Sequence, residues 1–290
     1  MTSFIVFLVT GLSNAGILAL IALGLVLIMR ATGTFNFAQG QFMLLPAILA
    51  ASLQAAGWPF WLCILLGTAA GAVIAALFYR FVLERTTGLS QIFPIIATLG
   101  FAEVIDGAMG IVFGTPSHSL RVPFLPTGTV ELWGARFNAG SLTVTVASLL
   151  FAVAVAAVLR YTRVGARLRA AGQDPLLASM GALNVRRIFT ASWMVAAVLA
   201  AFAGFAYAST TVINPTVVGV ALLAAPAIVL GGLDSIEGAI VGALIIGFVQ
   251  AATITLLGGQ YAEVISYVIL LLVLQFKPQG LFGTKQIVRA

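Results

Sequence analysis

The sequence contains one cysteine and one histidine. Cys63 lies in an apolar run, and His118 lies in a loop rich in proline and serine. A single thiol cannot build a disulfide framework, and a lone imidazole without a second His or Cys nearby is not a zinc site. No metal site is expected. An intramembrane enzyme is the least favoured class, because no His/Asp metal cluster and no placed Ser–His pair can be found in the sequence.

Charged residues are also scarce. They make up 8% of the chain, against about 25% in a soluble domain, while 61% of the residues are hydrophobic and the mean hydropathy is +1.15. This composition predicts a polytopic membrane protein with one transmembrane domain over residues 1–290, because the longest polar stretches, under about thirty residues, are too short for an independent core. The formal net charge is +6, but the arginines cluster at the ends of apolar runs, which is the positive-inside pattern. No nucleic-acid partner is expected.

No phosphate-binding loop of the G-x-x-x-x-G-K-[ST] type is present. The nearest sequence, Gly280–Lys285, lacks the spacing. We therefore expect no cofactor bound by this chain, so any ATP chemistry has to reside on partner subunits. The first apolar run has no Lys or Arg before Arg30 and is longer than the roughly 7–15 apolar residues of a signal peptide. It predicts a transmembrane helix.

Apolar runs long enough to span a bilayer predict an all-α bundle of eight or nine transmembrane segments. A span needs about 20 mostly apolar residues. The predicted segments lie near residues 4–29, 37–54, 60–80, 92–113, 141–159, 188–212, 219–232, 238–257 and 261–276. The seventh is short and ends in glycine, which is typical of a half-helix or re-entrant segment.

The distribution of Lys and Arg favours nine segments and sets the orientation. With nine, the clusters of basic residues share one side: Arg80 and Arg85, the loop 160–187, and Lys277, Lys285 and Arg289. This predicts a cytoplasmic loop at 160–187 and an extracytoplasmic loop at 114–140. The amino terminus is then outside and the carboxyl terminus in the cytoplasm.

The cytoplasmic loop has a local pattern of its own. It contains six arginines and one acid, Asp174. Asp174 suits a helix N-cap, Pro175 suits the first helical position, and no helix breaker follows until Gly181. A short capped helix on a basic surface suggests a docking site for a cytoplasmic partner. The alternative is a plain positive-inside loop, which explains the arginines but not the helix.

Polar residues enter the membrane region at Thr34–Phe42, with Asn36, Gln39, Gly40 and Gln41. Unpaired amides in hydrocarbon are costly, so they face the protein interior, a cavity or each other. A broken helix lining a transport pathway accounts for them. So does a loop in the headgroup region, where amides are free.

Two further interruptions follow. The stretches 213–219 and 225–238 are broken by Pro215, Pro226, Gly231 and Gly232. In the fourth span Glu103 and Asp106 are three residues apart and share one helical face. A carboxylate at the centre of a span costs about 2.5–3.5 kcal/mol, so we expect Glu103 to face the bundle or to be protonated. It either contacts a substrate ammonium or a proton, or pairs with a buried polar neighbour.

Ordered motifs run through nearly the whole chain. They are Asn-Phe-Ala-Gln-Gly within 24–41, Arg-x-x-Ala with Asp, Ala and Gly-x-Asn within 165–184, Ala-Gly leading to Ile-Asn-Pro within 203–215, Leu-Gly-Gly-x-x-Ser-x-x-Gly within 229–242, and Pro-x-Gly-Leu-x-Gly within 277–283. In this order and spacing the sequence resembles the membrane-spanning permease subunits of ATP-binding-cassette (ABC) importers for branched-chain and other hydrophobic amino acids.

The resemblance implies a pore-forming subunit of the bacterial inner membrane that has no ATPase of its own. Its partners would be two nucleotide-binding ATPase subunits, a second and usually non-identical permease, and a periplasmic or extracellular substrate-binding protein. ATP binding would push a helix at 173–184 and drive alternating access.

Site residues follow from the resemblance and from the polar pattern together. Contact with the ATPase is implied for Arg167, Asp174, Pro175, Ala178, Gly181 and Asn184. The signature near the translocation path matches at Asn36, Gln39 and Gly40. The pathway prediction also includes Glu103, Asp106, Asn214, Pro215, Gly231 and Gly232. Two departures leave the substrate open: the position of Gln39 is often His in the family, and the acidic pair is not expected there.

Two alternatives remain at this point. One is the same machine moving urea or short-chain amides. The other is a self-sufficient proton-coupled carrier that uses Glu103 and Asp106 and needs no ATPase.

Overall fold

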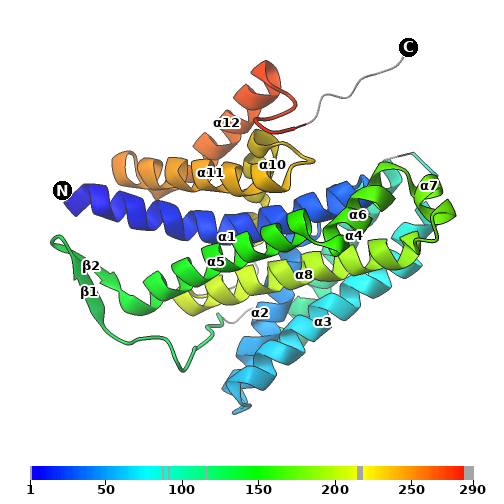
Figure 1. Cartoon of the computed structure of the whole chain (residues 1–290). Helices are drawn as coiled ribbons and strands as arrows, with labels where there is room; N and C mark the ends of the chain where they lie inside the picture. The colour runs from blue at the N-terminus through cyan, green and yellow to red at the C-terminus, as the bar shows by residue number, and fades with distance from the viewer. Residues whose placement is uncertain (1, 87, 91, 115–116, 214–217, 284–290) are drawn as a thin grey trace.

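The computed structural model describes residues 2–86, 88–90, 92–114, 117–213 and 218–283, and these form a helical bundle (Figure 1). Its longer helices are α1 (Thr2–Thr32), α3 (Phe60–Phe81), α4 (Ile92–Phe113), α5 (Ala139–Tyr161), α8 (Val185–Thr210), α11 (Ile236–Leu256) and α12 (Ala262–Phe276). The shorter elements are α2 (Gln39–Ala55), η1 (Leu83–Thr86), β1 (Thr129–Leu132), β2 (Ala135–Asn138), α6 (Arg163–Gln173), α7 (Pro175–Met180), α9 (Val218–Leu222), α10 (Ala224–Gly231) and η3 (Gly259–Tyr261).

Seven helical segments within the described residues are long and apolar enough to cross a membrane. The remaining predicted segments are α2, of 17 residues, and the stretch at 219–232, which is divided into α9 and α10. An eight-residue helix such as α10 is only about 12 Å long, well short of the roughly 30 Å hydrocarbon core. The predicted all-α bundle with a broken segment is therefore confirmed.

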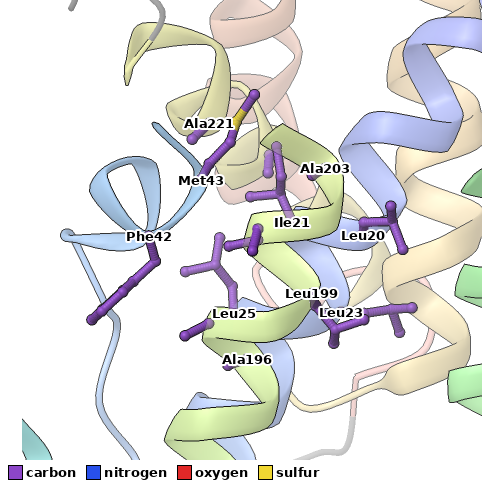
Figure 2. Close-up of a cluster of buried hydrophobic side chains, with 14 of the residues drawn as sticks. Leu20, Ile21, Leu23, Leu25, Phe42, Met43, Ala196, Leu199, Ala203 and Ala221 are labelled. Carbon is purple, nitrogen blue, oxygen red and sulfur yellow. The ribbon is translucent and has the colours of Figure 1, made fainter. Parts of the chain in front are cut away.

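The central element is α1, which packs against α11, α8 and α5. Its side chains Leu20, Ile21, Leu23 and Leu25 belong to one buried cluster with Phe42 and Met43 of α2 and with Ala196 and Ala203 of α8 (Figure 2). Lipid tails are as apolar as these side chains, so dense packing rather than transfer from water holds such helices together.

Glycines allow the closest helix contacts. A Cβ on Gly204 of α8 would overlap the carbonyl oxygen of Met43 in α2, and one on Gly242 of α11 would overlap that of Ala227 in α10. On α3, a Cβ at Gly67 would lie 2.7 Å from the Pro46 carbonyl oxygen of α2. Only hydrogen fits at these positions, so glycine sets the distance between the helices.

The two ends of the bundle are formed by different elements (Figure 1). The amino terminus and the β1–β2 hairpin lie at one end, and α6 and α7 at the other (Figure 1). The hairpin turns at Trp133 and Gly134, with φ of 47° and 83°, as a two-residue hairpin turn with positive φ at both positions requires. The sequence predicted only a loop at 114–140, because each strand is four residues long and too short to show a clear alternation of apolar and polar residues. The described residues 117–140 and 160–187 thus lie at opposite ends of the bundle in Figure 1, and which end is cytoplasmic stays a prediction.

We predict that Gly204→Val destabilises the folded chain, because the added methyl groups force α8 away from α2. Overpacking of this kind costs about 1–3 kcal/mol. Unfolding of the purified chain in a denaturing detergent measures the loss. Gly110→Ala in α4 is the matched control, since a Cβ there meets nothing within 4 Å; an equal loss in both variants would contradict the close contact.

Candidate functional site

Helix α2 begins inside the bundle. The chain turns after α1 at Gly33, with φ +67°, and α2 starts only at Gln39. Gln39 Nε2 donates to the carbonyl oxygen of Ala196 at 3.3 Å, and Ala196 lies near the middle of the 26-residue α8. The first turn of α2 therefore lies near half depth. This agrees with the broken-helix interpretation and not with a loop in the headgroup region.

Amide side chains hold this start in place. Asn36 Nδ2 donates to Gln39 Oε1 at 3.0 Å, and the backbone N–H of Ala38 donates to Asn36 Oδ1 at 3.0 Å. Asn36 is 1% exposed and Gln39 is 2% exposed. A Cβ on Gly24 of α1 would lie 2.5 Å from Gln39 Nε2, so that glycine makes room for the amide. We call Asn36, Gln39 and the Ala196 carbonyl the amide clamp.

Next to the amide clamp, α2 contacts α4 through a polar pair. Gln41 Nε2 donates to Asp106 Oδ2 at 3.0 Å. Gln41 Oε1 and Asp106 Oδ1 are buried without a hydrogen-bond partner in the described residues. Asp106 thus pairs with a buried polar neighbour.

Glu103 behaves differently from Asp106. It is exposed on the outer face of α4, and none of the ion pairs within the described residues includes it. The expectation that Glu103 faces the bundle of this chain is wrong. Glu103 and Asp106 are less than one turn apart and differ by about 60° around the helix axis, which places Asp106 beside α2 and Glu103 on the exposed side. Gly100, Gly107 and Gly110 also leave open space along α4.

The predicted capped helix in the basic loop is confirmed as α7. Asp174 Oδ1 accepts from the Leu177 N–H at 2.9 Å, and Pro175 is the first helical residue. The helix is shorter than the 173–184 implied by the resemblance. A separate helix, α6, precedes it because Arg163–Gln173 has an amphipathic pattern, with Leu168 and Ala171 buried and with Arg163 and Arg167 exposed.

The apolar side chains of α7 that face outward were not singled out from the sequence. Leu176, Leu177 and Met180 are 71%, 64% and 77% exposed, whereas Ala178 is 7% exposed and turns toward its own chain. Ala178 is therefore not on the surface available to a partner. The sequence signal that could have identified them is the presence of three large apolar residues within a polar, arginine-rich loop.

The other predicted coupling residues shape the ends of helices. Asn184 Oδ1 caps α8 by accepting from the Arg187 N–H at 3.0 Å. Gly181 follows α7 with φ −77°, and the left-handed conformation falls instead on Ala182, with φ 61°. Arg167 lines a cavity of about 240 Å³ between α5, α6 and α8.

Of the remaining predicted pathway residues, Gly40 is buried in the first turn of α2. Gly231 and Gly232 pack against the carboxyl-terminal segment: the N–H groups of Leu281 and Phe282 donate to the carbonyls of Leu230 and Gly231 at 2.7 and 2.9 Å. They are not part of the amide clamp. Asn214 and Pro215 lie outside the described residues.

The polar groups of α2 and α4 converge near half depth of the bundle. They offer hydrogen-bond acceptors inside a membrane and no nucleophile–base pair. Within the described residues, no group of three or more His, Cys, Asp or Glu side chains could hold a metal ion. Such an arrangement suits recognition and passage of a solute.

Comparison with known proteins places the chain among transport proteins. The model of the family described as "Branched-chain amino acid transport system / permease component" matches residues 7–274. The "High-affinity branched-chain amino acid transport system permease protein LivH" of Salmonella typhimurium is 28% identical, over 96% of this chain and 94% of that protein. The corresponding protein BraD of Pseudomonas aeruginosa is 26% identical, over 97% and 96%. The solved structure "PsaBC from Streptococcus pneumoniae in complex with Fab" has a similar fold, with a TM-score of 0.53, 13% identity, and 94% and 92% of the two chains covered.

We predict that Gln39→Leu destabilises the chain by about 1–3 kcal/mol, because the amide donor of Asn36 and the Ala196 carbonyl are left buried without Gln39. Gln39→His is the matched control. An imidazole can accept from Asn36 at one nitrogen and donate to Ala196 at the other, so most of the stability returns. Unfolding in a denaturing detergent compares the two. A leucine variant as stable as the wild type would contradict the clamp.

Proposed function

Because the chain belongs to the family of branched-chain amino acid transport permease components, we propose that it forms the translocation path of an ABC importer for branched-chain or other hydrophobic amino acids. The observation that carries this proposal is the end-to-end likeness: the family match spans residues 7–274, and LivH and BraD align over nearly the full chain. The buried polar groups of α2 and α4 support a pathway for a solute with hydrogen-bond donors.

The energy source lies on other chains. The sequence has no phosphate-binding loop, so two ATPase subunits supply ATP hydrolysis, and a substrate-binding protein delivers the amino acid from outside. The second permease is a non-identical subunit. Exposed Leu176, Leu177 and Met180 of α7 support an ATPase contact at this helix, since an exposed apolar patch surrounded by polar residues marks a protein interaction site.

Movement of α7 reaches the pathway through packed elements. Gly172 of α6 lies so close to the Arg30 carbonyl of α1 that a Cβ would overlap it, which makes α6 and α1 one rigid unit. Helix α7 packs against α8, and the Ala196 carbonyl of α8 accepts a hydrogen bond from Gln39. A push on α7 therefore moves α8, the amide clamp and the start of α2 together.

The exposed face of α4 completes the pathway in this proposal. A carboxylate at the centre of a span costs about 2.5–3.5 kcal/mol when it faces lipid. Glu103 is exposed in the isolated chain. In the assembly, a water-filled path shared with the second permease would hydrate this carboxylate and avoid the cost of placing it in lipid. The end with α6 and α7 is cytoplasmic and the amino terminus is outside, as the basic residues favour.

The proposal is tested by uptake of radiolabelled leucine into vesicles that contain this chain, its partner permease and ATPases, with binding protein added. Uptake requires ATP. In Leu177→Asp, a charge on the exposed face of α7 prevents ATPase docking, and both co-purification of the ATPases and uptake fall by at least about tenfold, the effect of 1.4 kcal/mol.

Leu177→Met is the control, because it keeps an apolar side chain at the same place, and it retains both activities. Leucine uptake by this chain alone down a proton gradient would reject the importer and support the proton-coupled carrier. ATP-driven uptake of urea or acetamide without leucine would retain the machine but change its substrate.

For Glu103→Gln we predict a changed initial rate or a changed preference among leucine, isoleucine and valine, with membrane insertion intact, because the variant removes a charge facing the path. We expect the initial rate or the preference ratio to change by about threefold or more, which is less than the tenfold change that corresponds to 1.4 kcal/mol. Glu263→Gln, in the exposed first turn of α12, is the control. Unchanged rate and preference in Glu103→Gln would remove this residue from the pathway.

A further inference from the structure

Three arginines from three helices meet at the end of the bundle that contains α6. Arg30 near the end of α1, Arg160 near the end of α5 and Arg169 of α6 line a cavity of about 240 Å³. Ile236 and Glu237, at the start of α11, complete its lining. The proposed function assigns no role to this cavity.

The charges of this cavity do not cancel. Glu237 Oε1 pairs with Arg160 Nη1 at 2.8 Å. Arg169 donates to the backbone carbonyls of Leu159 at 2.7 Å and Arg160 at 3.3 Å, which orient its guanidinium without neutralising it.

Arg30 is half-buried, and no ion pair within 4 Å engages it in the described part of the chain. Asp234 acts on Arg30 electrostatically and has an interaction of its own. The lining itself thus contains three cations and one acid, and two guanidiniums present donors to an anion.

An apolar groove continues from the same cavity along the membrane-spanning helices. It has a volume of about 290 Å³ and shares Arg160, Ile236 and Glu237 with the charged cavity. The rest of its lining is Val153, Ala156, Ala157, Tyr161 and Ile240. Val153 and Arg160 are two helical turns apart on α5, so the groove extends about 10 Å from the charged end into the hydrophobic depth.

We propose that the charged cavity and the groove together bind one anionic phospholipid. The phosphate accepts hydrogen bonds from Arg30 and from those N–H groups of Arg169 that do not donate to the Leu159 and Arg160 carbonyls, since a guanidinium has five N–H donors. One acyl chain lies between α5 and α11. A free anion would leave the groove empty, and a neutral lipid would leave the excess positive charge without a partner. The inference requires only that the chain spans a bilayer, and it is independent of the transported solute.

The proposed lipid site also lies where the ends of several helices meet. It bridges the ends of α1 and α5 with the start of α11 and with α6, and α6 in turn packs against α7. Basic pockets between transmembrane helices near the cytoplasmic surface are common sites for acidic headgroups.

The test uses the full-length chain purified in a mild, phosphate-free detergent buffer. Dioleoyl phosphatidylglycerol, dioleoyl phosphatidylcholine and inorganic phosphate are added separately, and native mass spectrometry counts bound lipid while thermal unfolding reports stabilisation. We expect phosphatidylglycerol to bind and to raise the unfolding temperature, and the other two to do neither. Arg30→Gln binds phosphatidylglycerol about tenfold more weakly, the effect of one lost charge-assisted contact.

Two further variants make the result decisive. Ala157→Phe fills the groove, leaves every charge in place and also reduces binding, so it decides the matter if Arg30→Gln does not fold. Arg80→Gln, an exposed arginine at the same end on α3, binds lipid like the wild type. Equal binding of phosphatidylcholine, or full binding by both Arg30→Gln and Ala157→Phe, would overturn the proposal. Equal stabilisation by inorganic phosphate would overturn the lipid in favour of a free anion.

Discussion

The start of α2 inside the membrane depends on the hydrogen bond from Gln39 to the Ala196 carbonyl. A helix that begins in hydrocarbon exposes its first backbone N–H groups and the polar chain that leads to it, and each unsatisfied group costs several kcal/mol. Asn36 caps the turn through the Ala38 N–H and fixes the Gln39 amide, so the polar cost is met within the protein. Gly24 provides the space. Without this arrangement the chain between α1 and α2 would have to move to the membrane surface.

Placement of α2 then determines the neighbours of α4. Gln41, in the first turn of α2, donates to Asp106 on the side of α4 that faces α2, while Glu103 lies on the exposed side. A pair of acids that share one face by sequence spacing therefore has two different surroundings. One acid is fixed within the chain, and the other is presented to whatever covers α4 in the assembly.

At the end of the bundle away from the amino terminus (Figure 1), α6 and α7 form a compact unit against the ends of α1, α5 and α8. The close contact between Gly172 and Arg30 fixes α6 against α1, and α7 packs against α6 and α8. An ion pair between Arg186 and Glu84, at 2.6 Å, adds η1 to the same end. Force applied to α7 is thus distributed to several membrane helices at once. The arginine cavity lies between α6 and the ends of α1, α5 and α11, so the proposed lipid would contact α6 of this unit.

The sequence by itself determined the membrane class, most of the span boundaries, the broken segment at 219–232 and the capped helix α7, because apolar run length and capping chemistry are local properties of the chain. Its ordered motifs also identified the family. Only the tertiary structure decided which side of α4 each acid faces, that Ala178 is turned inward while Leu177 is exposed, and that Arg30, Arg160 and Arg169 line one cavity. These facts depend on the rotation of each helix about its axis and on contacts between residues far apart in the chain. Neither is encoded in a run of hydrophobicity, since in a membrane the faces of a helix toward lipid and toward protein are equally apolar.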